Sequence, residues 1–294
     1  MNTCSPLIAT TSRASRKKNG SFYTPPEIAA YVTRQTLKPL LQGRPPSSVK
    51  QLRILDPACG GGVFVQEAFK LLLQSYQERG SPRDSRGIDL AIRKRILRSQ
   101  LFGVDQDEEA IEVTKANLAR ICVTPHDEKP LTSRQNRLIH DLQRDLSPNF
   151  CRGNALIAPD ELRPVAESGN DIQPFDWRAT FADVFSHGGF DAVIGNPPFI
   201  NIRQLTLGHG EAVKASLNHR YQCARGAYDT YVLFVEKALE LLRPAGMCGF
   251  IVPNKIATLG YAQPCREMLL QQTTIHRIDD VYAVKMFQGA GVYP

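Results

Sequence analysis

The chain has 294 residues, 42% of them hydrophobic, and carries a formal net charge of +7. This length and hydrophobic content exclude wholesale disorder and fit one large α/β domain or two small ones. The sequence contains no run of 18 hydrophobic residues and has a polar, basic beginning, so we expect neither a membrane span nor a secretory signal. The basic surplus is compatible with a polyanionic partner, although many other proteins are basic.

The seven cysteines are scattered along the chain and include no C-x-x-C pair. This pattern predicts reduced thiols in a cytoplasmic protein, without a disulfide framework or a structural zinc site. The six histidines also lack the spacing of metal ligands, so no metal is expected.

The first 20 residues carry four basic side chains and no acidic one, which predicts a flexible basic tail. A solvated terminus and a phosphate-binding arm both fit that composition. Thr24-Pro25-Pro26-Glu27 then predicts the start of a helix that runs to about Leu41, with Thr24 as its cap. We assign residues 21–294 to one catalytic domain.

Strands and helices are predicted to alternate through the rest of the chain. Strands are expected at 52–56, 101–104, 190–195, 247–252, 275–279 and 281–284, and helices at 63–76, 108–121, 228–242 and 265–271. This alternation predicts an α/β fold with a mostly parallel sheet and helices on both faces. Two basic segments, an insertion at 83–98 with a short helix and a polar loop at 201–225, interrupt the alternation.

A glycine turn follows the first predicted strand and predicts a nucleotide-like ligand. The sequence Pro57-Ala58-Cys59-Gly60-Gly61-Gly62 links that strand to a helix, but Val65 occupies the third glycine position of the dinucleotide fingerprint. Asp56 precedes the glycines, and its carboxylate would repel a pyrophosphate and attract a cation. S-adenosylmethionine carries an ammonium and a sulfonium and no phosphate, so it fits this turn better than a dinucleotide.

Two further polar residues end strands or precede turns. Asp105 closes the next strand, where its carboxylate could bind both ribose hydroxyls or simply lie at the surface. Asn154 could contact an adenine edge or form an Asx turn.

Asn196-Pro197-Pro198-Phe199 is the most informative motif. It follows the strand 190–195, which must end there because neither proline can donate a ladder hydrogen bond. Asn196 therefore lies at the carboxyl end of a strand, where open α/β sheets bind ligands. One amide, a stiff turn and one aromatic face suit a planar amino group, although a simple Pro-Pro turn with a buried Phe199 would have the same sequence.

With these motifs in order, the chain resembles the gamma-class adenine-specific DNA methyltransferases of restriction–modification systems. The resemblance rests on segments 22–27, 55–62, 103–105, 153–156, 196–199, 228–234, 246–253 and 286–288, which are similar to that family's motifs X, I, II, III, IV, V, VI and VIII. It implies a Rossmann-like fold with seven strands and S-adenosylmethionine as cofactor.

The resemblance also implies roles for individual residues. The cofactor would be lined by Tyr23, Thr24, Asp56, Ala58, Cys59, Gly60, Gly62, Asp105, Asn154, Pro198 and Phe234. Catalysis would depend on Asn196, Pro197, Pro198 and Phe199, with the target adenine held between Phe199 and Phe287. The base would have to flip out of a DNA duplex, and the two basic segments would then face phosphates.

Two other functions remain compatible with the sequence. A protein-glutamine methyltransferase uses a similar Asn-Pro-Pro-aromatic turn on a side-chain amide, and an inactive fragment could bind only cofactor or a partner subunit. The chain ends seven residues after Phe287, before the family's target-recognition domain, so a separate or downstream specificity element is expected.

Overall fold

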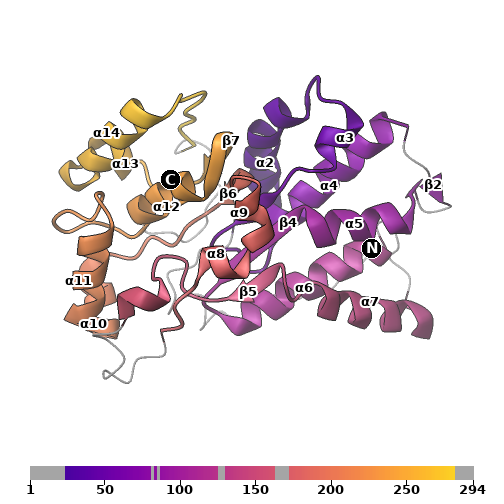
Figure 1. Ribbon diagram of the computed structural model, residues 1–294, viewed down its shortest axis with the longest axis horizontal. Coiled ribbons are helices and arrows are strands. Elements are labelled where there is room, and N and C mark those ends of the chain that lie inside the picture. The colour runs from indigo at the N-terminus through magenta and orange to yellow at the C-terminus, as the bar shows by residue number, and fades with distance from the viewer. Residues whose placement is uncertain (1–23, 81–82, 85–86, 125–129, 163–171, 282–294) are drawn as a thin grey trace, which may run out of the picture.

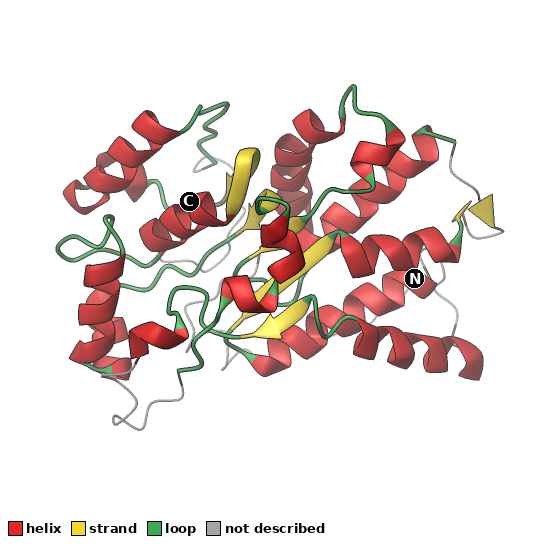
Figure 2. Cartoon of the chain, viewed as in Figure 1, coloured by secondary structure: helices red, strands yellow, loops and turns green. Residues whose placement is uncertain are grey.

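The computed structural model describes residues 24–80, 83–84, 87–124, 130–162 and 172–281. The predicted basic tail, Tyr23 and Phe287 lie outside the described residues, as does most of the predicted strand 281–284. Within the described residues, helices surround a central sheet (Figures 1 and 2).

Five strands form this sheet, in the order β5–β4–β1–β6–β7, and every neighbouring pair is parallel. Their bounds are β1 Ile54–Asp56, β4 Leu101–Asp105, β5 Phe150–Arg152, β6 Phe190–Gly195 and β7 Leu242–Phe250. A separate two-stranded sheet pairs β2 Arg83–Asp84 with β3 Gly87–Ile88. The predicted parallel α/β fold is confirmed.

The prediction of seven strands is wrong for the described part of the chain, because residues 275–279 form no strand. This segment has only two isolated isoleucines among charged residues, so it offers no hydrophobic face to pack on the sheet. Its polar groups contact side chains instead: Asp279 Oδ2 accepts hydrogen bonds from Tyr31 Oη at 3.1 Å and from Arg277 Nε at 2.6 Å.

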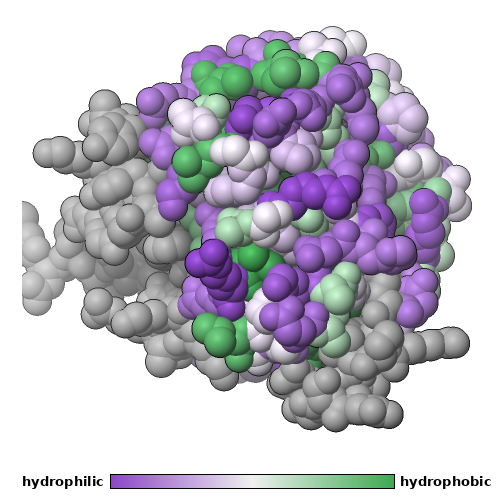
Figure 3. All heavy atoms as spheres, turned by 90° about the vertical axis from the view of Figure 1, so that its left-hand side faces the viewer, coloured by the Kyte–Doolittle hydropathy of each residue, from purple (hydrophilic) through white to green (hydrophobic). Residues whose placement is uncertain are grey.

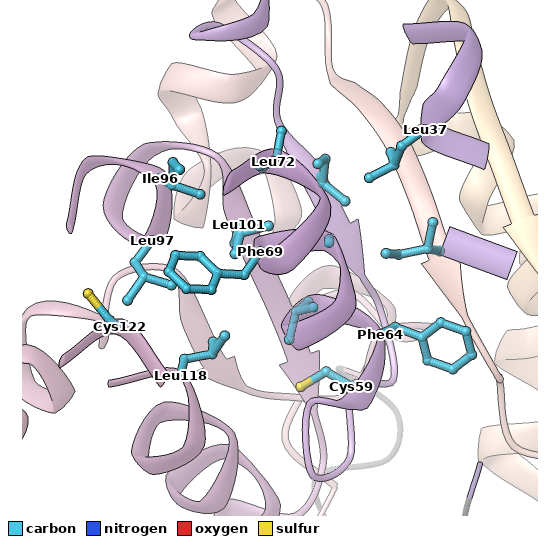
Figure 4. Packing of buried hydrophobic residues seen from close by; sticks show 14 of the residues in the cluster. Leu37, Cys59, Phe64, Phe69, Leu72, Ile96, Leu97, Leu101, Leu118 and Cys122 are labelled. Carbon is cyan, nitrogen blue, oxygen red and sulfur yellow. The ribbon is translucent and has the colours of Figure 1, made fainter. Parts of the chain in front are cut away.

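Two hydrophobic clusters cover the two faces of the sheet, since successive strand residues point to opposite sides. One contains Ile54 and Ile194 and joins α2 (Pro26–Leu41), α4 (Val63–Glu78), α5 (Leu90–Ser99), α6 (Glu108–Val123) and α7 (Ser133–Asp145). Figure 4 shows its centre, where Phe69, Leu72, Leu97 and Leu101 pack together.

The second cluster contains Leu55 and Val193 and lies on the opposite face. It joins the short helices α8 (Trp177–Thr180) and α9 (Ala182–Ser186) with α10 (Ile202–His209), α11 (Glu211–Arg220), α12 (Tyr231–Leu241) and α14 (Gln263–Gln272). The remaining short elements are α3 (Pro46–Val49), η1 (Pro159–Leu162), α13 (Lys255–Thr258) and η3 (Gly260–Ala262).

Several predicted elements differ from the structure in their extent. The segment 201–225 is largely helical, forming α10 and α11, where a loop was expected. The helix expected at 228–242 begins at Tyr231, and the strand expected at 247–252 begins earlier, at Leu242.

The basic insertion lies at the amino edge of the sheet, away from the ends of the strands that carry the motifs. Helix α5 ends at Ser99 and β4 begins at Leu101, so α5 leads into the start of a strand. Figure 1 shows α5 on the opposite side of the molecule from α10 and α11. Arg93 is buried and donates to the Cys122 carbonyl at 2.9 Å, and Arg98 pairs with Asp145. Helix α5 of this insertion therefore lies away from the strand ends that carry the motifs.

No helix in the described residues has both the length and the hydrophobicity needed to cross a membrane.

Candidate functional site

The glycine turn lies at the carboxyl edge of the sheet, where a carboxylate from the neighbouring strand holds it. Asp105 Oδ2 accepts a hydrogen bond from Gly60 N at 2.8 Å, and Oδ1 accepts one from Asp107 N at 2.9 Å. Gly62 begins α4 with φ +80°, and a Cβ there would lie 2.7 Å from Thr114 Cγ2. The turn therefore needs glycine at position 62 both for its backbone angle and for the closeness of α6.

Asp56 is a buried carboxylate with a free oxygen. Its Oδ1 accepts from Ala58 N at 3.1 Å, whereas its Oδ2 is buried without a hydrogen-bond partner among the described residues. Burial raises the pKa of Asp56 to about 8, and the Asp105 carboxylate adds to that rise. A Cβ on Gly195 would lie 2.7 Å from Asp56 Oδ1, so glycine at 195 allows the carboxylate to lie beside β6.

Cys59 contributes its backbone to the turn, while its side chain packs in the core. Figure 4 shows the Cys59 side chain among the buried hydrophobic residues. The residue is 3% exposed, and a Cβ on Gly103 would lie 3.0 Å from its Sγ. Burial, reinforced by Asp105 and Asp56, raises the pKa of its thiol well above the usual range. Cys59 is thus a neutral core thiol, and its side chain is not a candidate nucleophile.

The Asn196 side chain is oriented by Thr24, the first described residue of the chain. Its Nδ2 donates to Thr24 Oγ1 at 3.1 Å, and its Oδ1 is buried with no partner among the described residues. The prediction that Thr24 caps α2 is wrong, because the N-cap is Pro25, whose carbonyl accepts the first helical bonds. The Thr24 hydroxyl is therefore available to Asn196.

The Asn-Pro-Pro-Phe turn is fixed by the segment that precedes α12. Thr230 Oγ1 donates to the Pro198 carbonyl at 2.6 Å and accepts from Ile200 N at 3.2 Å. The Thr230 N–H also donates to the Ile200 carbonyl at 2.8 Å. The Pro197 carbonyl accepts no hydrogen bond from the described part of the chain, so its oxygen remains available to a ligand.

A small pocket adjoins the turn and contains three of the predicted cofactor residues, Asn154, Pro198 and Phe234. Its other lining side chains include Gln106 and Thr230 and the hydrophobic residues Ile172, Ile200, Leu205, Val213 and Leu217. Asn154 Oδ1 accepts from Leu156 N at 3.0 Å in an Asx turn, and its Nδ2 donates to Gln106 Oε1 at 3.4 Å. Gln106 is thus the polar partner of Asn154 at this pocket.

The structure thus brings Thr24 to Asn196 and joins Asp56, Asp105 and the glycine turn at one edge of the sheet. Sequence reasoning missed the residues that support them, Thr114, Gln106 and Thr230. Thr114 Oγ1 donates to the Gly60 carbonyl at 2.7 Å from the middle of α6. Nothing in its local sequence distinguishes this threonine from an ordinary helical residue. In the described part of the chain, no cluster of His, Cys, Asp and Glu could hold a metal ion.

The described face beside this edge, formed by α10, α11, α13 and α14, is mostly hydrophilic, with small separate hydrophobic patches (Figure 3). Arg203 and Arg225 are exposed there and form no ion pair within the described residues. Arg220, in contrast, pairs with Glu240 at 2.6 Å, and Lys214 pairs with Glu211 at 3.1 Å.

A family of restriction–modification methylases matches the part of the chain that carries Asp105 and the Asn-Pro-Pro-Phe turn. The family model described as the Eco57I restriction-modification methylase matches residues 99–287. The chain therefore belongs to that family.

Curated relatives extend the similarity to most of the chain. The type II restriction enzyme and methyltransferase RM.Eco57I of Escherichia coli is 22% identical over 290 residues, covering 92% of this chain and 27% of that protein. The type II methyltransferase M.BanIII of Aneurinibacillus aneurinilyticus is 23% identical over 275 residues, covering 94% of this chain and 37% of that protein. The chain thus spans less than half the length of these relatives.

Two solved structures share the fold. A DrdV–DNA complex matches with a TM-score of 0.55 and 17% identity, covering 87% of this chain and 23% of that chain. The type IIL restriction-modification enzyme MmeI in complex with DNA matches with a TM-score of 0.52 and 16% identity, covering 88% of this chain and 34% of that chain.

Proposed function

We propose that this chain transfers a methyl group from S-adenosylmethionine to the exocyclic amine of a flipped-out adenine in DNA, as the modification activity of a restriction–modification system. The observation that carries this proposal is the Asn196 amide: its nitrogen is held by Thr24, and its oxygen is buried without a partner. A buried acceptor with no donor is costly unless a ligand satisfies it. Family membership supports the same activity. On this proposal the protein works in the cytoplasm, on DNA.

The residues present fit S-adenosylmethionine. The cofactor, when bound, supplies a methyl group on a positively charged sulfur. Asp56 offers a buried free oxygen to a cation, and Asp105 would exchange its hydrogen bond with Gly60 for ribose hydroxyls. Asn154, Pro198 and Phe234 line the small pocket beside them, and an amide together with flat apolar side chains suits the edge and the faces of the cofactor's adenine ring.

The target amine needs acceptors more than it needs a base. The lone pair of an adenine amino nitrogen is delocalised into the ring, which makes the nitrogen a weak nucleophile. The Asn196 oxygen and the Pro197 carbonyl can accept its two N–H groups and favour a tetrahedral nitrogen. Phe199 would stack on one face of the base, and Phe287 is proposed for the other.

Calorimetry with S-adenosylmethionine and its demethylated product tests the cofactor assignment, with NAD as the control ligand. The proposal predicts binding of the first two ligands and no binding of NAD. Binding of NAD alone, or no binding by a protein whose circular dichroism shows it to be folded, would refute the assignment.

Cofactor binding is expected to strengthen as pH rises towards about 8, where Asp56 ionises. Below that pH the cofactor-free protein holds a proton on Asp56, and a cationic ligand must displace it. The contribution of Asp56 to the affinity should therefore rise by up to about tenfold per pH unit below pH 8 and level off above it. Titrations in two buffers of different ionisation enthalpy measure the proton released.

Asp56→Asn is the control for this pH dependence, because the ligand's own amino group titrates equally in both proteins. The variant should bind more weakly and lose the proton release attributed to position 56. Equal proton release by wild type and variant would assign the titration to another group.

Arg203 and Arg225 are proposed to contact DNA phosphates. Replacing either by alanine should weaken binding to all DNA sequences alike and reduce the slope of log K against log salt by about 1. Arg98→Ala is the matched control, since Arg98 lies on α5 at the opposite edge and pairs with Asp145. Gel-shift titrations at several salt concentrations give the slopes. The same change of slope in all three variants would show only a non-specific charge effect.

A further inference from the structure

The aromatic residue of the Asn-Pro-Pro-Phe turn is held at its edge by a buried tyrosine. The rings of Phe199 and Tyr231 meet edge to face, with centroids 6.0 Å apart and an interplanar angle of 81°. Tyr231 is fully buried at the start of α12, whereas Phe199 is half-buried. The buried Tyr231 ring limits the rotation of Phe199 as long as Tyr231 itself is held in this orientation.

A series of hydrogen bonds runs from Tyr231 through Tyr261, a residue 30 positions later in the sequence, to Asp229. The hydroxyls of Tyr231 and Tyr261 are 3.1 Å apart, and Tyr261 Oη donates to Asp229 Oδ2 at 2.9 Å. A phenol has a single proton, so Tyr231 must donate to Tyr261, which in turn donates to Asp229. Burial raises the pKa of Tyr231 to about 12 and that of Tyr261 still further, so both hydroxyls keep their protons.

Asn201 connects this series of hydrogen bonds to the segment that follows the Asn-Pro-Pro-Phe turn. Asp229 Oδ1 accepts from Asn201 Nδ2 at 2.9 Å, and the two residues also form an antiparallel β-bridge. Asn201 Oδ1 accepts from Arg203 N at 3.1 Å and caps α10. These contacts form a closed ring, because the backbone joins Asn201 to Phe199. The ring connects three segments of the chain just after the turn: Phe199 to Asn201, Asp229 to Tyr231, and Tyr261.

We propose that Tyr261 is a positioning residue for the target base: acting through Tyr231 and Asp229, it fixes the ring of Phe199 at the angle that a flipped base needs for stacking. This inference rests on the proposed function. Tyr261 touches neither Asn196 nor the glycine turn by any hydrogen bond of the described residues, so its effect should fall on the base and spare the cofactor. A ring that is free to rotate would stack the base in several poses, and few of them would place its amine for transfer.

Tyr261→Phe and Tyr228→Phe form a matched pair of variants. Tyr228 is also buried, and its hydroxyl donates to Asn218 at 3.0 Å, outside the ring of contacts. Tyr261→Phe should lower the turnover of methyl transfer to unmethylated DNA by about tenfold, with little change in the dissociation constant for S-adenosylmethionine. Tyr228→Phe should leave both values close to wild type.

A double-mutant cycle of stability tests the same contact without any need for activity. The shifts in urea midpoint caused by Tyr261→Phe and Phe199→Leu should be non-additive, whereas those of Tyr228→Phe and Phe199→Leu should add. Additive shifts in the first pair, or wild-type turnover of Tyr261→Phe, would overturn the proposal. If wild type transferred no methyl group, the proposed function would fail, and the cycle alone would decide whether Tyr261 positions Phe199.

Discussion

Asn196→Ala is expected to lower the rate of methyl transfer by about a hundredfold or more, the loss typical of removing one preorganised polar group from a transition state. The variant lacks the buried oxygen that we assign to the target amine, and the Thr24 hydroxyl loses its donor. Cofactor affinity should change little, because the carboxylates and the glycine turn remain. Single-turnover transfer of labelled methyl to DNA, together with calorimetry of cofactor binding, separates the two effects.

Asn218→Ala is the matched control for that substitution. Asn218 is an exposed asparagine on α11 that accepts one hydrogen bond from Tyr228. Its replacement should leave transfer near the wild-type rate. Full activity of Asn196→Ala would contradict the assigned role, whatever the control showed.

Asp105→Ala is expected to weaken S-adenosylmethionine binding by about 1–3 kcal/mol. The carboxylate that would bind ribose hydroxyls also accepts the Gly60 N–H, so its removal loosens the glycine turn as well. Affinity should fall while the turnover of the saturated enzyme falls less, because Asn196 and the Pro197 carbonyl are unchanged. Calorimetry and the cofactor dependence of the initial rate measure the two quantities.

Asp107→Asn controls for loss of a carboxylate at the same edge of the sheet. Asp107 caps α6 by accepting from Glu109 N at 2.9 Å, and asparagine is an equally good cap. This variant should bind the cofactor like wild type. Equal loss of affinity in the Asp105 and Asp107 variants would show that general electrostatics, rather than a specific contact, attracts the ligand.

Local sequence was enough to predict the positions of Asp56, Asp105 and Asn196, because each ends or directly follows a strand with a clear hydrophobic pattern. Parallel strands bring such ends to one edge, so their proximity follows from the fold class. The contact of Thr24 with Asn196 could not be predicted in this way. The two residues are 172 positions apart, and the local signal at Thr24 favoured a helix cap.

Charge runs and short hydrophobic patterns were the weakest guides to where a segment lies in the fold. The basic segment 83–98 was expected beside DNA, but the fold places its helix at the amino edge, where Arg93 is buried and Arg98 is paired. The residues 275–279 have the composition of a weak strand but lack a continuous hydrophobic face. In both cases tertiary placement, which local composition does not encode, determined the outcome.

Identifying the molecule that accepts the methyl group tests the central proposal most directly. The protein is incubated with labelled S-adenosylmethionine, unmethylated DNA and a protein with an exposed glutamine, and the DNA is then digested to nucleosides while the protein is digested to peptides. We predict label in N6-methyldeoxyadenosine and none in the peptides. Label in a glutamine side chain or in a methylated cytosine, or no label from a folded protein that binds the cofactor, would contradict the assignment of DNA adenine as the substrate.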